Sequence, residues 1–397
     1  MESWFFFIFW ISLFILFYSY IGYGILLYIV IRVKRLFFPS GSENQEEVSF
    51  RPKVTFMVAA YNEASFIREK IANTLALDYP ADLLEIIFVT DGSTDGTDAI
   101  IADYPQIRVL HEPARKGKTV AINRAMSFAT APYVIFSDAN TLLNKDAVSR
   151  LISWFRDPAT GAVAGEKKVI AAADDAEGMG EGAYWKYESL LKKWDAELYS
   201  VMGAAGELFA IRTELYEPIP ADTILDDFVI SFGVNMRGYK VKYAPDAYAM
   251  ETPSASLGEE YKRKVRISAG GFQSMGMLLP LFNVFRYPRI TWQYVSHRVL
   301  RWTLAPLCLP LALLSNIALV WLQAGNLYTL VLGLQLAFYI ASAAGYILAR
   351  KGIKVPYCYI PFYFLFMNIA VYHGFSRFLK KRQSAVWERS ERRINFS

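Results

Sequence analysis

Long apolar runs mark the two ends of the chain, and shorter alternating patterns fill its middle. Residues 4–31 carry no charge and are rich in Phe, Ile, Leu and Tyr, and the run is longer than the roughly 20 residues that a helix needs to cross a bilayer. A cleaved signal peptide would have a shorter apolar core and a small-residue cleavage site, so we expect a permanent membrane anchor. Because Arg32, Lys34 and Arg35 follow directly, the downstream end of this anchor is predicted to be cytoplasmic.

Three more runs long enough to span a membrane lie near the other end of the chain, at residues 303–322, 327–349 and 355–375. The stretch 274–288 is apolar but broken by Gly and Pro, and it is predicted to lie in the membrane interface instead. Three crossings would carry the tail outside, whereas its Lys and Arg residues favour the inside. The last run, with Pro356, Pro361 and His373, is the weakest of the three, so the side of the tail stays open.

Between these ends, from residue 53 onwards, short apolar strands alternate with helices. Strands are predicted at residues 54–60, 84–90, 107–110 and 133–137, and helices at residues 64–77, from 98 onwards and at 121–128. This alternation is typical of a parallel sheet with crossover helices, so the predicted fold class is α/β. In such a sheet ligands bind at the carboxyl ends of the strands, and polar residues follow the apolar runs here.

Composition and charge argue against several classes of protein. With 54% hydrophobic residues in a chain of 397, there is room for one large domain plus membrane segments. The net charge of +5 is modest, and the basic residues cluster beside apolar runs, which favours lipid headgroups over nucleic acid as partners. Cys308 and Cys358 lie in apolar stretches, so a disulfide framework or a thiolate metal site is not expected. The 3 histidines show no zinc spacing. The spanning runs hold almost no ionisable residues, so a transporter or channel is not expected.

The polar residues that follow the strands suggest a site for a phosphate group and a cation. Ser137-Asp138-Ala139-Asn140 places carboxylate and amide oxygens at a strand end, and a hard divalent cation prefers oxygen ligands. A turn without any ligand explains the same residues equally well when they are taken alone. Lys118 and Arg115 supply donors for a diphosphate, or they form a solvated basic loop.

Taken in their order and spacing, these motifs resemble the family 2 glycosyltransferases, whose catalytic domain has the Rossmann-like, nucleotide-sugar-binding GT-A fold. The resemblance covers about residues 54–273 and rests on Ala60-Tyr61-Asn62-Glu63, Asp91-Gly92-Ser93, Gly117-Lys118 with Asn123, and Ser137-Asp138-Ala139-Asn140. More narrowly, the chain is similar to the membrane-embedded members that build bacterial surface polysaccharides, relatives of the cellulose, hyaluronan and poly-N-acetylglucosamine synthases.

The apolar runs and the resemblance together predict an order of segments along the chain. They are an N-terminal transmembrane anchor (1–35), a linker (36–52), a GT-A catalytic domain (53–255), an interfacial, acceptor-side segment (256–298), C-terminal transmembrane helices (299–378) and a basic tail (379–397). The expected location is the cell (inner) membrane, with several crossings and a cytoplasmic catalytic domain.

The resemblance also implies which residues hold the donor. Donor-binding residues would be Tyr61, Glu63, Asp91, Lys118, Asn123, Asp138 and Arg266, and Asp138 and Asn140 would bind Mg²⁺ or Mn²⁺. Glu63 and Asp91 would accept hydrogen bonds from the base or ribose, and the metal would neutralise the leaving diphosphate; alternatively, Asp91 only caps the turn after its strand. Family members usually carry Asp-x-Asp, whereas Asn140 brings no charge, so weaker metal binding is expected.

The same comparison implies a general base and an acceptor site. The family carries its base in an acidic pair ahead of a Gly-Tyr, which here is Asp226-Asp227 ahead of Gly238-Tyr239. Asp227 would take the proton of the acceptor hydroxyl, and Asp226 would orient it or cap a helix; the alternative is that both only complement a helix dipole. Acceptor contacts would come from Gly203, Gly206 and Glu207, in the region that lines the acceptor site of the family. Trp185, upstream of it, is a candidate for stacking on a sugar face, although an aromatic residue on a helix is more often a packing residue.

One family motif is altered in this chain. Processive members carry Gln-x-x-Arg-Trp, whose tryptophan lies under the acceptor sugar, and the matching stretch here runs from Arg263 to Ile267. Arg266 keeps its place as a diphosphate contact, but Ile267 does not offer the same stacking surface, which argues against processive polymerisation.

The leading hypothesis is therefore a membrane-bound, inverting glycosyltransferase, of the hexosyl- or N-acetylhexosaminyl-transferase type. It would move a sugar from a nucleotide-sugar donor, preferably a UDP-sugar, to a polyprenyl-linked acceptor or a growing polysaccharide, alongside polysaccharide assembly and export proteins. The alternative is a catalytically inactive relative that acts as a membrane scaffold or sugar-nucleotide sensor, for which Asn140 is the one support.

Overall fold

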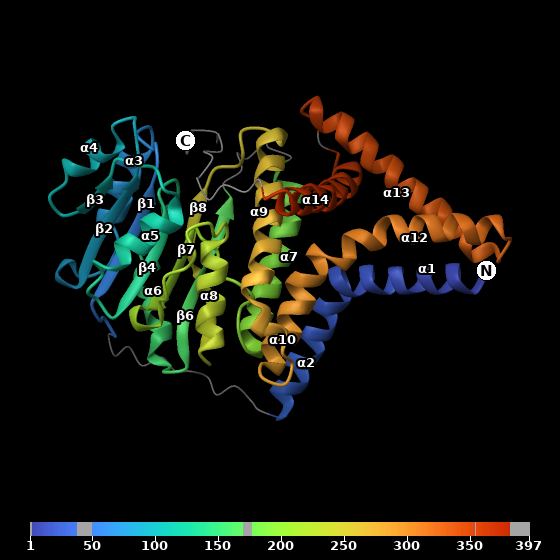
Figure 1. The fold of residues 1–397 in the computed structure, drawn as a ribbon, viewed down its shortest axis with the longest axis horizontal. Helices are drawn as coiled ribbons and strands as arrows, with labels where there is room; N and C mark the ends of the chain where they lie inside the picture. Colours follow the sequence, from blue (N-terminus) through green and yellow to red (C-terminus); the bar gives the residue numbers. More distant parts are fainter. Residues whose placement is uncertain (1, 38–49, 170–176, 354, 382–397) are drawn as a thin grey trace.

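A computed structural model gives the architecture of residues 2–37, 50–169, 177–353 and 355–381. Figure 1 shows a sheet covered by helices at one end of the long axis and apolar helices at the other, with the long helices α7 (Glu177–Leu198) and α9 (Leu257–Met277) between them. Most of the predicted linker and of the basic tail falls outside the described residues.

Eight strands form one mixed sheet in the described part of the chain, in the order β3-β2-β1-β4-β7-β6-β8-β5. They are β1 (Val54–Ala60), β2 (Leu84–Asp91), β3 (Arg108–Glu112), β4 (Tyr133–Asp138), β5 (Leu142–Leu143), β6 (Thr160–Val169), β7 (Leu208–Arg212) and β8 (Lys240–Glu251). β1 pairs in parallel with β2 and β4, and β2 with β3, as predicted for an α/β fold. β7 runs antiparallel to both β4 and β6, so the sheet becomes mixed beyond β4.

Short helices pack on this sheet. They are α3 (Ile67–Leu75), α4 (Thr97–Ala102), α5 (Lys118–Met126), α6 (Ala147–Ser153) and α8 (Asp226–Met236), with the 3₁₀ turns η2 (Ala81–Leu83), η3 (Trp154–Arg156) and η4 (Thr213–Leu215). The turn η5 (Leu279–Phe282) lies away from the sheet, where Leu281 clusters with Ile290 and Tyr294. Gly96 and Gly117 have positive φ and directly precede α4 and α5. Glycine adopts this conformation at little cost, so the chain turns sharply from each strand into the next helix.

The central strand β1 is buried on both faces, which explains its continuous apolar sequence. Val54, Phe56 and Val58 face a core that includes residues of α3, α4 and α6. Met57 and Ala59 point the other way, into a core shared with α5 and α8. Because helices occupy both faces, the polar residues at the strand ends remain accessible only from the edge of the sheet.

Four helices in the described residues are long and apolar enough to cross a membrane. The first consists of α1 (Glu2–Phe17), the π turn η1 (Tyr18–Gly22) and α2 (Tyr23–Phe37), and the others are α12 (Leu304–Trp321), α13 (Asn326–Arg350) and α14 (Pro356–Leu379). These helices coincide with the four apolar runs predicted to span.

The last of these helices lies differently from the others. Figure 1 shows α1 and α12 side by side along the long axis, whereas α14 is seen nearly end-on beside α9. A Cβ added at Gly374 of α14 would lie 2.5 Å from the Cβ of Ser268 on α9, and Phe272 stacks with Phe378 at a ring-centroid distance of 6.1 Å. α14 therefore packs closely against α9 of the domain.

Two further connections join the domain to the membrane helices. A helix made of α10 (Pro288–Tyr294), the π turn η6 (Val295–Val299) and α11 (Leu300–Trp302) leads into α12. On the first membrane helix, Lys34 Nζ donates to the carbonyl of Glu197 at 2.8 Å, and Arg35 pairs with the Glu197 carboxylate at 2.6 Å. Since Glu197 is on α7, the basic end of the anchor lies at the domain.

Candidate active site

A cleft of about 570 Å³ opens at the carboxyl ends of β1 and β4, where α8 and α9 also contribute to its wall. It brings together most of the predicted site residues, namely Tyr61, Glu63, Lys118, Asp138, Asn140, Trp185, Gly206, Glu207, Asp226, Asp227 and Arg266. These residues come from distant parts of the sequence and from several elements, so only the fold gathers them into one site.

Lys118, the first residue of α5, links two acidic groups of the cleft. Its Nζ donates to Asp138 Oδ1 at 2.8 Å and lies 3.5 Å from Asp226 Oδ2. Burial alone would lower the pKa of Lys118, but the Asp138 and Asp226 carboxylates outweigh that effect and raise the pKa. Lys118 is therefore a fixed cation at neutral pH, as binding of a phosphate group requires.

The turn that follows β4 is held from behind by a buried lysine. Lys70, on α3, is fully buried, and its Nζ donates to Ser137 Oγ at 2.7 Å and to the Thr141 carbonyl at 2.9 Å. Burial lowers the pKa of Lys70 to about 7, with the Asp138 charge acting in the opposite direction. Because these bonds hold both ends of the turn, they fix Asp138 and Asn140 at the edge of the cleft.

The Asp138–Asn140 turn fits a cation that is shared with a phosphate. Asn140 Oδ1 is buried and has no hydrogen-bond partner among the described residues. Burial raises the pKa of Asp138, and the Lys118 charge opposes that rise. The described residues contain no group of three or more His, Cys, Asp or Glu side chains that could hold a metal. Phosphate and water oxygens would therefore complete the shell of Mg²⁺ or Mn²⁺.

Asp226 and Asp227 begin α8 in the wall of the cleft. Burial and the neighbouring Asp226 charge raise the pKa of Asp227 to about 7. A Cβ added at Gly206 would lie 3.4 Å from Asp227 Oδ2 and 3.6 Å from Lys118 Nζ, so this glycine keeps the space between the two side chains open. A carboxylate with a pKa near neutrality beside an open space has the properties of a general base.

The loop that precedes the acidic pair is tied to α9. Gln273 accepts a hydrogen bond from the Ile224 N–H at 3.0 Å and donates one to the Asp222 carbonyl at 2.8 Å. A Cβ added at Gly270 would lie 2.7 Å from the Leu225 side chain, so the loop rests directly on the helix. Gln273 and Gly270 thereby position the acidic pair, although Gln273 is out of register with the glutamine of the family motif.

Glu207 and Trp185, the predicted acceptor contacts, belong to a charged network in the cleft wall. Lys167 pairs with Glu207 at 2.5 Å and also with Glu251. The Trp185 ring lies 5.4 Å from Lys167 Nζ and 5.5 Å from Lys264 Nζ. Burial alone would raise the pKa of Glu207, but Lys167 outweighs it and lowers the pKa. The two predicted contacts are thus held in place by the same lysine.

The altered family motif lies on α9, at the same wall. Arg263, in the place of the family glutamine, lies 3.6 Å from Glu251 and 3.1 Å from Glu260 in ion pairs. An arginine suits this position because two buried carboxylates need a cation. Arg266 and Ile267 line the cleft itself.

Two predicted donor contacts, Asp91 and Asn123, do not line the cleft. Asp91 accepts the backbone N–H groups of Lys116 at 2.8 Å and of Gly117 at 2.7 Å. It therefore holds the loop that precedes α5. This role resembles the alternative expected from the sequence, in which Asp91 only caps a turn. Asn123 donates to the Ile219 carbonyl at 2.8 Å and accepts from the Tyr216 hydroxyl, so its amide is engaged inside the protein.

Gly203, a predicted acceptor contact, also lies outside the cleft wall. It has a φ of +93°, and an added Cβ would lie 2.4 Å from the Phe228 ring. The position therefore needs glycine both for its backbone conformation and for close packing.

Sequence reasoning missed four residues that build the site: Lys70, Lys167, Arg298 and Trp302. For Lys70 a signal existed, because it lies on the buried face of α3 with Ile67, Ile71 and Thr74, where a lysine is anomalous. Arg298 and Trp302 line the cleft from the helix that leads to α12, and no spacing in the sequence connects them to it.

Comparison with known proteins agrees with this architecture. Residues 55–219 match the family model for glycosyl transferase family 2. The poly-beta-1,6-N-acetyl-D-glucosamine synthase of Staphylococcus aureus (strain COL) is 29% identical over 230 residues, 55% of this chain and 55% of that protein. The synthase of the same name from Staphylococcus epidermidis is 26% identical over 230 residues, again 55% of each chain. This chain therefore spans about half the length of the curated relatives it matches.

Among solved structures, the mannosyltransferase PcManGT from Pyrobaculum calidifontis, in complex with GDP-Man and Mn²⁺, has a similar fold. The TM-score is 0.68 at 23% sequence identity, and the match covers 95% of this chain and 100% of the other. The match extends beyond the sheet to the apolar helices, because it includes nearly the whole chain.

Proposed function

We propose that this chain, which carries a glycosyl transferase family 2 domain at residues 55–219, is a membrane-bound, inverting glycosyltransferase. It would move a sugar from a nucleotide sugar, preferably a UDP-sugar, to a lipid-linked or growing glycan acceptor in cell-surface polysaccharide synthesis. The observation that carries the proposal is that Asp227, Lys118 and the Asp138–Asn140 turn line one cleft.

At the donor end, Lys118 and Arg266 would bind the diphosphate, and Tyr61 and Glu63 would contact the nucleoside. The Asp138–Asn140 turn would hold a divalent cation, which neutralises charge on the leaving diphosphate when bound. The complex of PcManGT with GDP-Man and Mn²⁺ supports both a nucleotide-sugar donor and a cation.

At the acceptor end, Asp227 would act as the general base. In its ionised form it would take the proton of the acceptor hydroxyl, whose oxygen bonds to the anomeric carbon as the bond to the diphosphate breaks. The oxygen attacks from the face opposite the diphosphate, so one carboxylate suffices and the anomeric configuration inverts. The pKa of Asp227, about 7, lets the group be ionised at neutral pH and still accept a proton.

The surroundings of the cleft support an acceptor that reaches it from the membrane. Arg298 and Trp302 line the cleft and belong to the helix that leads directly into α12. The basic end of the first membrane helix is bonded to α7, and such basic ends favour the cytoplasmic side. A nucleotide sugar from the cytoplasm and a lipid-linked acceptor would then meet at the inner face of the cell membrane.

The test is nucleoside-diphosphate release by the purified full-length protein in lipid. UDP- and GDP-sugars are supplied in turn with Mg²⁺ or Mn²⁺, and a membrane lipid extract serves as acceptor. We expect release with one donor, and we expect Asp227→Asn to reduce it by about 10²–10⁴-fold, the usual contribution of a general base. Asp82→Asn, at an exposed position before β2 that does not line the cleft, is the matched control.

The same experiment decides between transfer and the inactive alternative. Tight binding of a nucleotide sugar without any release would support a sensor or scaffold, in line with the uncharged Asn140. The size of the product would separate addition of one sugar from polymerisation.

A further inference from the structure

Trp302 provides an aromatic surface in the cleft that the altered family motif lacks. It lines the same cleft as Asp227 and Ile267, although it comes from α11 and not from α9. Its ring lies 5.5 Å from the ring of Phe228, the residue after Asp227. Trp302 is only partly buried, so part of the indole surface is available to a ligand beside the acidic pair.

The backbone of α9 supports this ring from one side. A Cβ added at Gly271 would lie 2.8 Å from indole atoms of Trp302, which is closer than real Cβ contacts. Glycine at position 271 therefore allows the ring to lie directly against the helix. The preceding Gly270 does the same for Leu225, at 2.7 Å, so the two adjacent glycines bring the ring and the acidic pair to the same stretch of α9.

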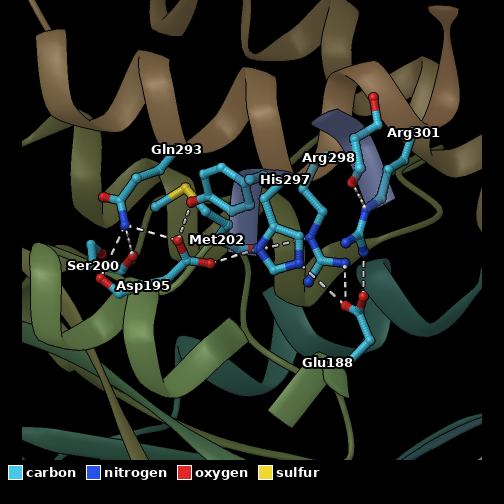
Figure 2. Close-up of polar contacts among 10 residues, drawn as sticks. Glu188, Asp195, Ser200, Met202, Gln293, His297, Arg298 and Arg301 are labelled. Atoms are coloured by element: carbon cyan, nitrogen blue, oxygen red, sulfur yellow. Dashed lines mark hydrogen bonds and ion pairs between the residues drawn. The ribbon is translucent and has the colours of Figure 1, made fainter. Parts of the chain in front are cut away.

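A buried charged network fixes the helix that carries this tryptophan. Figure 2 shows His297 between two carboxylates, with Nδ1 2.6 Å from Asp195 and Nε2 3.3 Å from Glu188. Arg301 also pairs with Glu188, and Arg298 donates to the Met202 carbonyl at 2.9 Å. Burial alone would raise the pKa of Glu188, but Arg301 and His297 hold it well below its usual value.

The network reaches the first membrane helix as well. Arg301 Nε donates to the carbonyl of Ser19 at 3.0 Å, within the π turn η1. Figure 2 also shows Gln293 bonded to Asp195, at 2.9 Å. The helix from α10 to α11 is thus held by α7 and by the anchor together, so Trp302 has a fixed place before any ligand binds, which lowers the entropic cost of binding.

We propose that Trp302 is the platform on which the terminal sugar ring of the acceptor stacks, in place of Ile267. The inference rests on the proposed function and adds that the attacked hydroxyl belongs to a pyranose ring, not to a bare lipid phosphate. One face of a pyranose carries C–H groups that form a flat apolar surface, and an indole matches that surface while its N–H remains free to bond a hydroxyl.

The test compares variants of the full-length protein in lipid, with the donor and membrane extract that support release by the wild type. Trp302→Ala is expected to raise the extract concentration for half-maximal rate about tenfold, while the affinity for the nucleotide donor stays within about twofold. Trp302→Phe keeps a flat ring, so its extract concentration for half-maximal rate should lie between those of the wild type and Trp302→Ala. Trp321→Ala, an exposed tryptophan on α12, should match the wild type.

A second pair of variants separates loss of the Trp302 contact from a general loss of folding. Gly271→Ala should act like Trp302→Ala, because its Cβ displaces the indole, whereas Gly276→Ala, on the same helix with nothing within 4 Å, should leave the acceptor dependence unchanged. A pure polyprenyl phosphate, offered alone, probes the other class of acceptor.

Three outcomes would overturn the inference. Unchanged acceptor dependence in Trp302→Ala would exclude the contact, and an equal loss of donor affinity would indicate a structural role. Use of pure polyprenyl phosphate by the wild type, at the rate that the extract supports, would contradict a pyranose acceptor. Absence of release by the wild type with every donor would contradict the proposed function first, before any variant is compared.

Discussion

Asp227 owes its chemical character to its neighbours. An isolated aspartate would be ionised throughout the neutral range, but burial and the adjacent Asp226 raise the pKa of Asp227 to about 7. Only the ionised form accepts a proton. The proposed transfer rate should therefore rise with pH through about 7 and fall below it.

Replacement of the neighbour tests this dependence. Asp226→Asn removes a like charge, so the pKa of Asp227 should decrease and the acidic limb of the rate profile should move to lower pH by about one unit. The measurement is nucleoside-diphosphate release between pH 5 and 9, with Asp82→Asn as the control. An acidic limb that stays in place would show that another group sets it.

The metal site can be tested by adding one negative charge to it at position 140. Asn140→Asp restores two carboxylates to the turn, and added ligand charge strengthens binding of a hard cation. The concentration of Mn²⁺ or Mg²⁺ for half-maximal release should decrease by about tenfold, and a chelator should abolish release by the wild type. Activity that a chelator leaves intact would contradict a metal at this turn.

At the scale of the elements, α9 is the helix that assembles the site. It binds the 222–224 loop through Gln273, accommodates Leu225 at Gly270, and carries the ion-paired Arg263. Its register against α8 therefore decides where the acidic pair lies.

Removal of the glutamine side chain should loosen that register. Gln273→Ala deletes three hydrogen bonds, to Ile224 and Asp222, each worth about 0.5–1.5 kcal/mol, and should reduce turnover by about tenfold with little change in donor affinity. Gln106→Ala, at an exposed position before β3, is the matched control. A drop in donor affinity of the same size would mean that the loop serves the donor site instead.

The contact between α13 and α14 depends on one glycine. A Cβ added at Gly345 would lie 2.2 Å from the carbonyl oxygen of Cys358, and small residues allow such close helix packing in membranes. Gly345→Ala should destabilise the protein in detergent by about 1–3 kcal/mol, as overpacking does. Gly333→Ala, on the same helix with nothing within 4 Å, should leave the thermal unfolding curve unchanged.

At the scale of the whole molecule, the orientation of α14 bears on the membrane topology. α1 and α12 run side by side, while α14 packs against α9 of the domain and is seen nearly end-on in Figure 1. We infer that α14 lies along the membrane interface, with three crossings in total. With the basic end of the first membrane helix on the cytoplasmic side, as proposed, three crossings leave the tail inside, which suits its basic residues.

Labelling of single cysteines tests this topology. In a variant without Cys308 and Cys358, Ser397→Cys should react with a membrane-impermeant maleimide only after the cells are opened, whereas Glu2→Cys should react from outside. Labelling of position 397 in intact cells would mean that α14 crosses the membrane.

Local patterns in the sequence were sufficient to predict the α/β class, the four parallel strands and the four apolar helices. Each depends on residues close together in the chain. A run of 28 uncharged, mostly apolar residues from 4 to 31 predicts a spanning helix, and an alternation of strand and helix patterns predicts an α/β sheet, without reference to any distant part of the chain. The family resemblance grouped Lys118, Asp138 and Asp227 in one site, and the structure brings these three residues to one cleft, while their roles stay predictions.

Which residues line the rest of the cleft could be learned only from the tertiary structure. Asp91 and Asn123 carry the family pattern, yet their side chains bond the 116–117 loop and Ile219 in the interior. Trp302 carries no pattern and lines the cleft, because a helix held by buried ion pairs brings it there. Backbone periodicity fixes the elements locally, whereas the partners of a polar side chain depend on packing between segments far apart in the sequence, which local pattern does not encode.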